Sequence, residues 1–150
     1  MPGGGALEVL QQKGVFELPS AELQRIVLDK YEEYVHPLLP VLDIVQFRRT
    51  ITGQDANTKI SLFLYHALIF IGLSCVDNDT ILRLARVSKR AARAAFYEKA
   101  NTLLEMDVEK DRAAICRVSI LLTGHPYQLD PKDATYWLGV AISQAYTMKV

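Results

Sequence analysis

The chain has 150 residues, half of them hydrophobic, and its 17 basic side chains are balanced by 17 acidic ones. This length and composition predict one globular domain with a sizeable core. The formal net charge of zero gives no overall field that would attract nucleic acid or an anionic membrane surface, so neither is an expected general partner. The two cysteines, Cys75 and Cys116, lie in separate apolar segments, which is typical of buried thiols in a reducing compartment and not of a disulfide framework.

The first 19 residues contain a run of three glycines and a further glycine at Gly14. Glycine loses more backbone freedom on folding than any other residue, so we expect residues 1–19 to form a flexible N-terminal segment and residues 20–150 to form the domain. The most apolar stretch, residues 60–75, is shorter than the ~20 residues that a bilayer span needs and has His66 near its centre. It is therefore predicted to be a core helix, and no contact with a membrane is expected.

Apolar residues recur at helical spacing along most of the chain, and no stretch shows the alternation of a β-strand. The pattern predicts an all-α fold of about seven packed helices. Ser20, Asp43 and Ser88 are predicted N-caps, because each precedes a helical segment and can accept a hydrogen bond from its first turn. The stretch 59–75 is apolar nearly all round, which predicts a central helix that is covered on several sides.

The last predicted helix stays apolar to the final residue, with no glycine or proline to end it. We therefore expect residues 20–150 to be a truncated, N-terminal part of a larger helical domain.

A turn with two prolines follows the first long helix. Pro37 is expected to end that helix, because the residue before a proline avoids the α conformation. The apolar face of the helix is predicted to comprise Leu23, Ile26, Val27, Tyr31, Tyr34 and Val35. Between Pro37 and Pro40, the large apolar residues Leu38 and Leu39 need a pocket, so the turn is predicted to be a rigid, buried corner.

None of the three histidines lies near another histidine, a cysteine or a carboxylate at the spacing of metal ligands. His66 is interpreted as a core histidine, and the rings of His36 and His125, which each precede a proline, are expected to hydrogen-bond across their turns. The sequence has no nucleophile paired with a base and no glycine-rich phosphate loop. We therefore predict neither an enzyme nor a metal or cofactor within this chain.

One basic cluster interrupts the neutral pattern, and no acidic residue occurs between residues 80 and 97. It consists of Arg83, Arg86, Lys89, Arg90 and Arg93. If a single helix ran through Ser88, its four arginines would share a stripe that could contact phosphate or an acidic partner. The alternative is a solvated face that pairs with Glu98, Glu105 or the acidic connection after them.

Three stretches together resemble the fungal-specific transcription factor domain, the regulatory or middle homology region that follows a zinc binuclear cluster in many fungal activators. Residues 31–47 resemble its opening pattern: an aromatic helix, His-Pro, two large apolar residues, Pro and Asp. Residues 97–104 and 137–145 resemble two later helices of the family. The sequences of these stretches are most similar to those of the cutinase transcription factor group. The matching residues of the first and third stretches include Tyr34, His36, Pro37, Leu38, Leu39, Pro40, Leu42, Asp43, Phe47, Trp137 and Gly139.

The resemblance implies a regulatory domain of a nuclear transcription factor that controls RNA polymerase II transcription through protein contacts, with co-regulator proteins or a second copy as partners. DNA would be bound only indirectly, because the zinc cluster needs six cysteines and this chain has two. Zinc is thus implied only for a cluster outside this chain.

Two alternatives remain open. One is a sensor that holds a small-molecule inducer between the central helix and the Trp137 helix. The other is a degenerate remnant of such a factor that does not bind DNA.

Overall fold

The computed structural model describes residues 4–38, 40, 43–51, 61–106, 111–124 and 134–148. Every regular element in these residues is a helix, which confirms the all-α prediction, with eight helices where about seven were predicted. They are α1 (Gly4–Gln12), α2 (Ala21–Tyr34), α3 (Ile44–Ile51), α4 (Leu62–Leu73), α5 (Asn78–Ala85), α6 (Lys89–Glu105), α7 (Arg112–Gly124) and α8 (Ala134–Met148).

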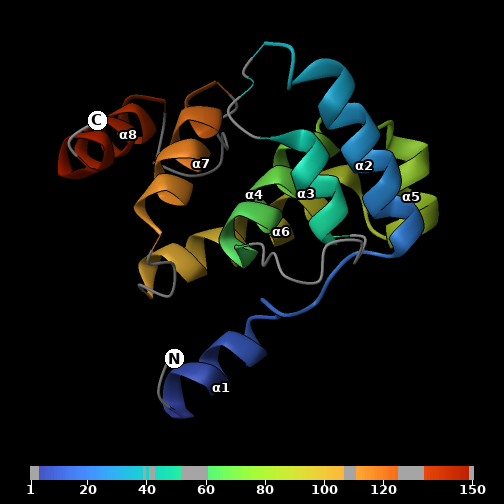
Figure 1. Cartoon of the computed structure of the whole chain (residues 1–150). Coiled ribbons are helices and arrows are strands. Elements are labelled where there is room, and N and C mark those ends of the chain that lie inside the picture. Colours follow the sequence, from blue (N-terminus) through green and yellow to red (C-terminus); the bar gives the residue numbers. More distant parts are fainter. Residues whose placement is uncertain are drawn as a thin grey trace.

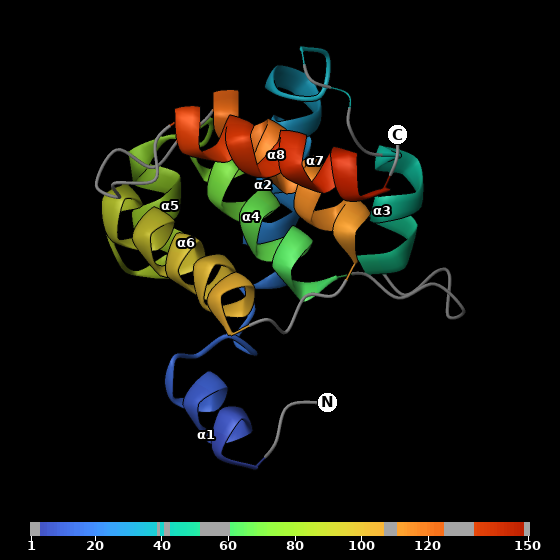
Figure 2. The same cartoon turned by 90° about the vertical axis from the view of Figure 1, so that its left-hand side faces the viewer.

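Helix α4 is the centre of the bundle, as its uniformly apolar sequence predicts. Its residues from Phe63 to Leu73 are all buried, and it packs against α2, α6 and α7. Figures 1 and 2 show these three helices around α4, with α8 lying on α7 and α1 apart from the bundle at one end of the molecule. Because no side of α4 tolerates water, its neighbours have to cover it on several faces.

The predicted helix starts at Ser20, Asp43 and Ser88 are confirmed. Each side chain accepts a hydrogen bond from the backbone N–H three residues later, at 3.1 to 3.2 Å. Ser61 and Asp77 cap α4 and α5 in the same way, although neither was predicted from the sequence. All five caps satisfy backbone N–H groups that have no partner within the helix.

Helices α2 and α4 approach each other closely at Gly72. A Cβ atom built on Gly72 would lie 2.6 Å from Cγ1 of Val27 and 3.0 Å from the Val27 backbone oxygen. Any larger residue would force these helices apart, so the glycine sets the distance between them.

Helix α3 is held on α2 by one arginine. The Arg48 guanidinium lies 2.8 Å from a carboxylate oxygen of Asp29 and 2.8 Å from one of Glu32. Ile44 and Phe47 on the other side of α3 are buried. Helix α3 is therefore held by buried apolar side chains on one side and, on the other, by the Arg48 cation that two carboxylates of α2 share.

Residues 4–12, within the N-terminal segment that its glycines predict to be flexible, form the helix α1. The physical reason is that two glycines lie in the first turn, whereas the rest of α1 consists largely of strong helix formers. Gly14 then takes a left-handed conformation, with φ of +70°, just after the helix ends. The domain boundary at residue 19 stays a prediction.

The prediction of a buried corner is wrong for Leu38, which is 78% exposed, and Tyr34 is also exposed at 52%. The chain keeps a helix-like path beyond α2: the N–H groups of Val35 and His36 both donate to the Tyr31 oxygen, and that of Leu38 donates to the Val35 oxygen. This path turns Tyr31 and Val35 inward, where both are buried, and turns Leu38 outward.

Some of the sequence predictions fall outside the described residues. These are the burial of Leu39, the match at Leu42, the turn of His125 and the acidic connection over residues 107–110. They stay predictions.

We expect Gly72→Ala to lower the free energy of unfolding by about 1–3 kcal/mol, because the new methyl group would overlap Val27. Gly139→Ala is the matched control: a Cβ atom added there would have no other atom within 4 Å, so the variant should gain up to about 1 kcal/mol from helix propensity. Urea unfolding of both variants checks the pair. Equal effects of the two substitutions would contradict a close α2–α4 contact.

We expect Leu38→Ala to change the free energy of unfolding by less than about 0.5 kcal/mol, as for an exposed site. Val35→Ala should cost about 2 kcal/mol, because Val35 is 1% exposed. Thermal and chemical unfolding of the two variants would show which residue anchors the turn. A larger loss of unfolding free energy for Leu38→Ala than for Val35→Ala would support the buried corner predicted from the sequence.

We expect the bundle to lose stability on acidification through His66. Burial lowers the pKa of His66 from 6.5 to about 4, so in this range the unfolded chain binds a proton that the folded chain does not. The loss should begin as the pH falls through about 6.5 and reach about 2–3 kcal/mol near pH 4.5. The His66→Gln variant should lack this loss of stability when its unfolding is measured near pH 6.5 and near pH 4.5. Identical pH profiles for the variant and the unsubstituted chain would argue against a role of His66.

Candidate functional site

The described residues contain no group of three or more histidines, cysteines or acidic residues that could hold a metal ion. Both cysteines are free thiols and partly buried. Within the same residues no helix has the length and apolarity needed to cross a bilayer. The candidates for a functional site are surfaces and pockets that could bind a partner.

The arginine stripe that one continuous helix would form is absent, because the chain breaks at Arg86. Arg86 adopts a left-handed conformation, with φ of 60°, and ends α5, whereas Ser88 caps the separate helix α6. The basic residues are thus divided between two helices. Ser88 was correctly predicted as a cap, and that cap excludes the stripe.

Three of the basic side chains already have partners within the chain. Arg83 lies 4.0 Å from the Glu22 carboxylate in an exposed ion pair. The Lys89 ammonium donates to the Ser74 oxygen at 2.8 Å, at the C-terminal end of α4. The Arg93 guanidinium stacks on the Phe70 ring at 4.5 Å. Arg90 makes no ion pair in the part of the chain that the structure describes, so its cation is available for a partner.

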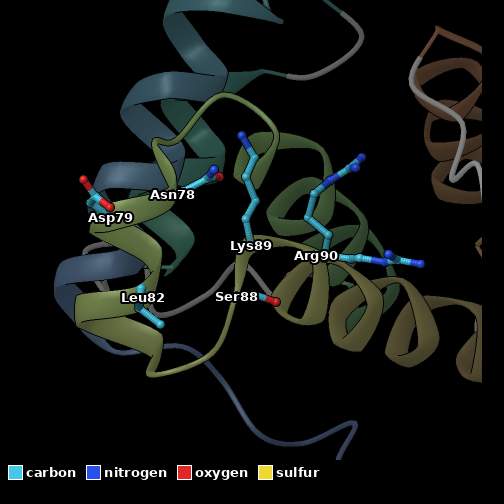
Figure 3. Close-up of a pocket in the computed structure, with 7 residues that line it drawn as sticks. Asn78, Asp79, Leu82, Ser88, Lys89 and Arg90 are labelled. Atoms are coloured by element: carbon cyan, nitrogen blue, oxygen red, sulfur yellow. The ribbon is translucent and has the colours of Figure 1, made fainter.

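An open hollow of about 480 Å³ lies between α5 and the start of α6. Figure 3 shows Lys89 and Arg90 projecting from the start of α6, with Asn78 and Asp79 on the first turn of α5. The lining residues are Asn78, Asp79, Leu82, Ser88, Lys89, Arg90 and Arg93. The contribution of α5 was not predicted from the sequence, although a cap at Asp77 would have placed Asn78 and Asp79 in its first turn.

The hollow combines positive charge with an apolar surface. Helix α6 has no acidic residue in its first turn, so the cations there add to the positive end of the helix dipole. Leu82 on the opposite wall is 57% exposed. Asp79 is the one carboxylate among the lining residues that the structure describes. This arrangement suits an anionic group beside an apolar side chain.

A second, buried hollow lies where an inducer pocket would be expected, between α4 and the helix of Trp137. It offers only about 10 Å³, which is close to the space of one water molecule. Its lining residues are Phe63, Ala67, Phe70, Tyr97, Ala100, Asn101, Leu122 and Trp137. Trp137 of α8 is 1% exposed and lines this space together with residues of α4 and α6. An organic ligand would require the helices to move apart.

The two described histidines occupy different environments. His66 is fully buried, and its Nε2 atom donates to the Val15 oxygen at 2.6 Å, which confirms a core histidine. His36 has a buried Nδ1 atom without a hydrogen-bond partner, so the cross-turn bond predicted for its ring is not made by that nitrogen.

The family motif residues are structural rather than clustered at one site. Asp43 caps α3, and Phe47 and Trp137 are buried. Pro37 and Pro40 are exposed, like Tyr34 and Leu38 beside them, and Gly139 faces open space. Among the motif residues that the structure describes, several shape helix ends or packing, and no pocket is lined by more than one of them.

Proteins similar to this chain are fungal transcription factors. The chain is 37% identical over 145 residues to cutinase transcription factor 1 beta of Fusarium vanettenii, a match that covers 95% of this chain. It is 32% identical over 139 residues to cutinase transcription factor 1 alpha of the same organism, covering 90% of this chain. A protein named transcription factor from Fusarium pseudograminearum (strain CS3096) is 30% identical over 141 residues and covers 93%.

The chain spans only 15 to 16% of the length of these curated relatives. No protein-family model matches it. No solved structure matches it either. The resemblance predicted from three short stretches is nevertheless confirmed by matches along nearly the whole chain. The chain is therefore a homologue of a segment of fungal transcription factors, with the cutinase transcription factors among its relatives.

Proposed function

We propose that this chain is a regulatory domain of a fungal transcription factor, which controls RNA polymerase II transcription in the nucleus through protein contacts. The single observation that supports the proposal most is the similarity of 90 to 95% of the chain to proteins named as transcription factors. DNA would be bound by a zinc cluster outside this chain, so the domain itself would transmit or restrain activation.

The outer face of α8 is the surface best suited to such contacts. Leu138, Ile142 and Tyr146 recur every four residues on it and are 49%, 51% and 82% exposed. No charged residue occurs in the range Ala134–Met148, whereas the outer face of a surface helix normally carries several. An exposed apolar stripe of this kind suits a co-regulator or a second copy of the chain.

The basic hollow offers a second contact of different chemistry. Arg90 lies at its rim without an ion pair in the described part of the chain, beside the apolar surface of Leu82. Such a surface suits an acidic segment of a co-regulator better than a bare phosphate, because it adds an apolar contact to the charge. Binding to duplex DNA would be the competing outcome, recognisable by its steep salt dependence.

The inducer-sensing alternative finds less support, because the hollow beside Trp137 has room for about one water molecule. A degenerate remnant would fold in the same way but would no longer influence transcription. The two alternatives therefore separate in an assay of transcription with and without added small molecules.

We expect the chain, fused to an unrelated DNA-binding domain, to change the output of a reporter gene. Ile142→Glu should remove most of that change, since a charge in an apolar contact weakens partner affinity by more than about tenfold. Arg90→Glu should do the same if the hollow is used as well. Ser143→Glu, on an exposed position of the same helix, is the matched control.

Circular dichroism would check that each variant of the chain remains folded. A reporter that responds equally to all three variants and to the unsubstituted chain would contradict regulation through these surfaces. A reporter that never responds to the unsubstituted chain would favour the remnant.

A further inference from the structure

Residues 10–17, here named the N-terminal strap, lie across the junction of α4 and α6. His66 of α4 donates from Nε2 to the Val15 oxygen at 2.6 Å, and Lys99 of α6 donates from Nζ to the Glu17 oxygen at 3.0 Å. Two helices thus each supply one side-chain donor to backbone oxygens two residues apart. This is how a protein surface recognises the main chain of a peptide.

The contact is buried as well as hydrogen-bonded. Leu10 is 1% exposed and Val15 is fully buried. His66 is also fully buried, and Lys99 is 9% exposed, with its ammonium 4.3 Å from the centre of the Phe96 ring. Burial of the apolar side chains therefore stabilises the contact, and the two polar donors determine which backbone oxygens of the strap lie next to His66 and Lys99.

The strap holds its own shape through local bonds. The Val15 N–H donates to the Leu10 oxygen, and the Glu17 N–H donates to the Gly14 oxygen. The left-handed Gly14 makes this tight path accessible. Figure 1 shows that α1 projects away from the bundle, although Leu10 in its last turn, which is part of the strap, is buried in the core. The strap is thus attached to the bundle by the burial of Leu10 and Val15 and by the two hydrogen bonds from His66 and Lys99.

The attached state leaves two polar groups poorly solvated. The Nδ1 atom of His66 is buried and has no hydrogen-bond partner. The Lys99 cation is desolvated, and this burial lowers its pKa. Helices α4 and α6 pack directly on each other, so their contact does not depend on the strap.

We propose that the α4–α6 junction is a binding site for a short peptide segment with a turn, which the N-terminal strap fills within the same chain. Release of the strap opens the site to a competing segment of like chemistry. The competitor has an aliphatic residue in the place of Val15 and presents backbone oxygens to His66 and Lys99. This inference concerns an internal competitor and goes beyond the proposed regulatory role.

The test uses the full chain and a fluorescent peptide with the sequence of residues 8–18 as the probe. Val15→Asp should displace the strap, because a carboxylate is unfavourable at a fully buried site. The variant should bind the peptide at least about tenfold more tightly than the unsubstituted chain, whose strap occupies the site most of the time. Leu7→Asp, at an exposed position of α1, is the matched control and should bind the peptide as weakly as the unsubstituted chain.

Gly14→Val provides a second way to release the strap without placing a charge in it. A side chain at φ of +70° is strained, and its Cβ would lie 3.2 Å from the Glu17 carboxylate. Adding Lys99→Met to either released variant should weaken peptide binding again, since one donor to the peptide backbone is lost. Circular dichroism checks that each variant is folded.

Peptide binding by a folded, strap-released variant no tighter than that of the unsubstituted chain would overturn the proposal. So would binding that Lys99→Met leaves unchanged. Neither outcome depends on transcription, so the binding assay can fail while the proposed function stands.

Discussion

Helix α4 has no face that can meet water, and this constraint organises the rest of the structure. Its side chains from Phe63 to Leu73 are buried, so α2, α6 and α7 must each supply an apolar surface along it. Gly72 lets α2 come close enough for direct backbone contact. The other elements are then attached to these helices: α3 through Arg48 to α2, and α8 to α7. The same exclusion of water applies to polar groups within the core. Each of them either has a hydrogen-bond partner or lowers the stability of the fold.

Most of the fold follows from the sequence because helix formation here is governed by local signals. Capping side chains such as Ser20 and Ser88 act within one turn, and the apolar pattern of α4 is continuous. The error at Leu38 arose because the path of the backbone after α2 decided which way the side chain points. The exposure of Leu38 depends on hydrogen bonds back to Tyr31 and Val35, and hydrophobicity alone could not reveal these bonds.

The candidate site was only partly predictable for the same reason. The cluster of basic residues was evident in the sequence, but its division at Arg86 and its pairing with α5 depend on a left-handed residue and on tertiary packing. Lys99 gave no sequence signal at all: its bond to the Glu17 oxygen joins residues 82 positions apart. Contacts of this kind have no local pattern, so only the folded chain brings them together.

The surfaces proposed for partners lie on elements that α4 does not need for its own cover. Helix α8 packs mainly on α7, and α5 packs on α2 and α6 without a major contact to α4 among the described residues. A partner could therefore bind to or leave these surfaces while the core stays closed. The strap differs, because His66 belongs to α4 itself and is covered by Val15. Its release would expose part of the central helix, so binding at that site is coupled to the core in a way that binding at α8 is not.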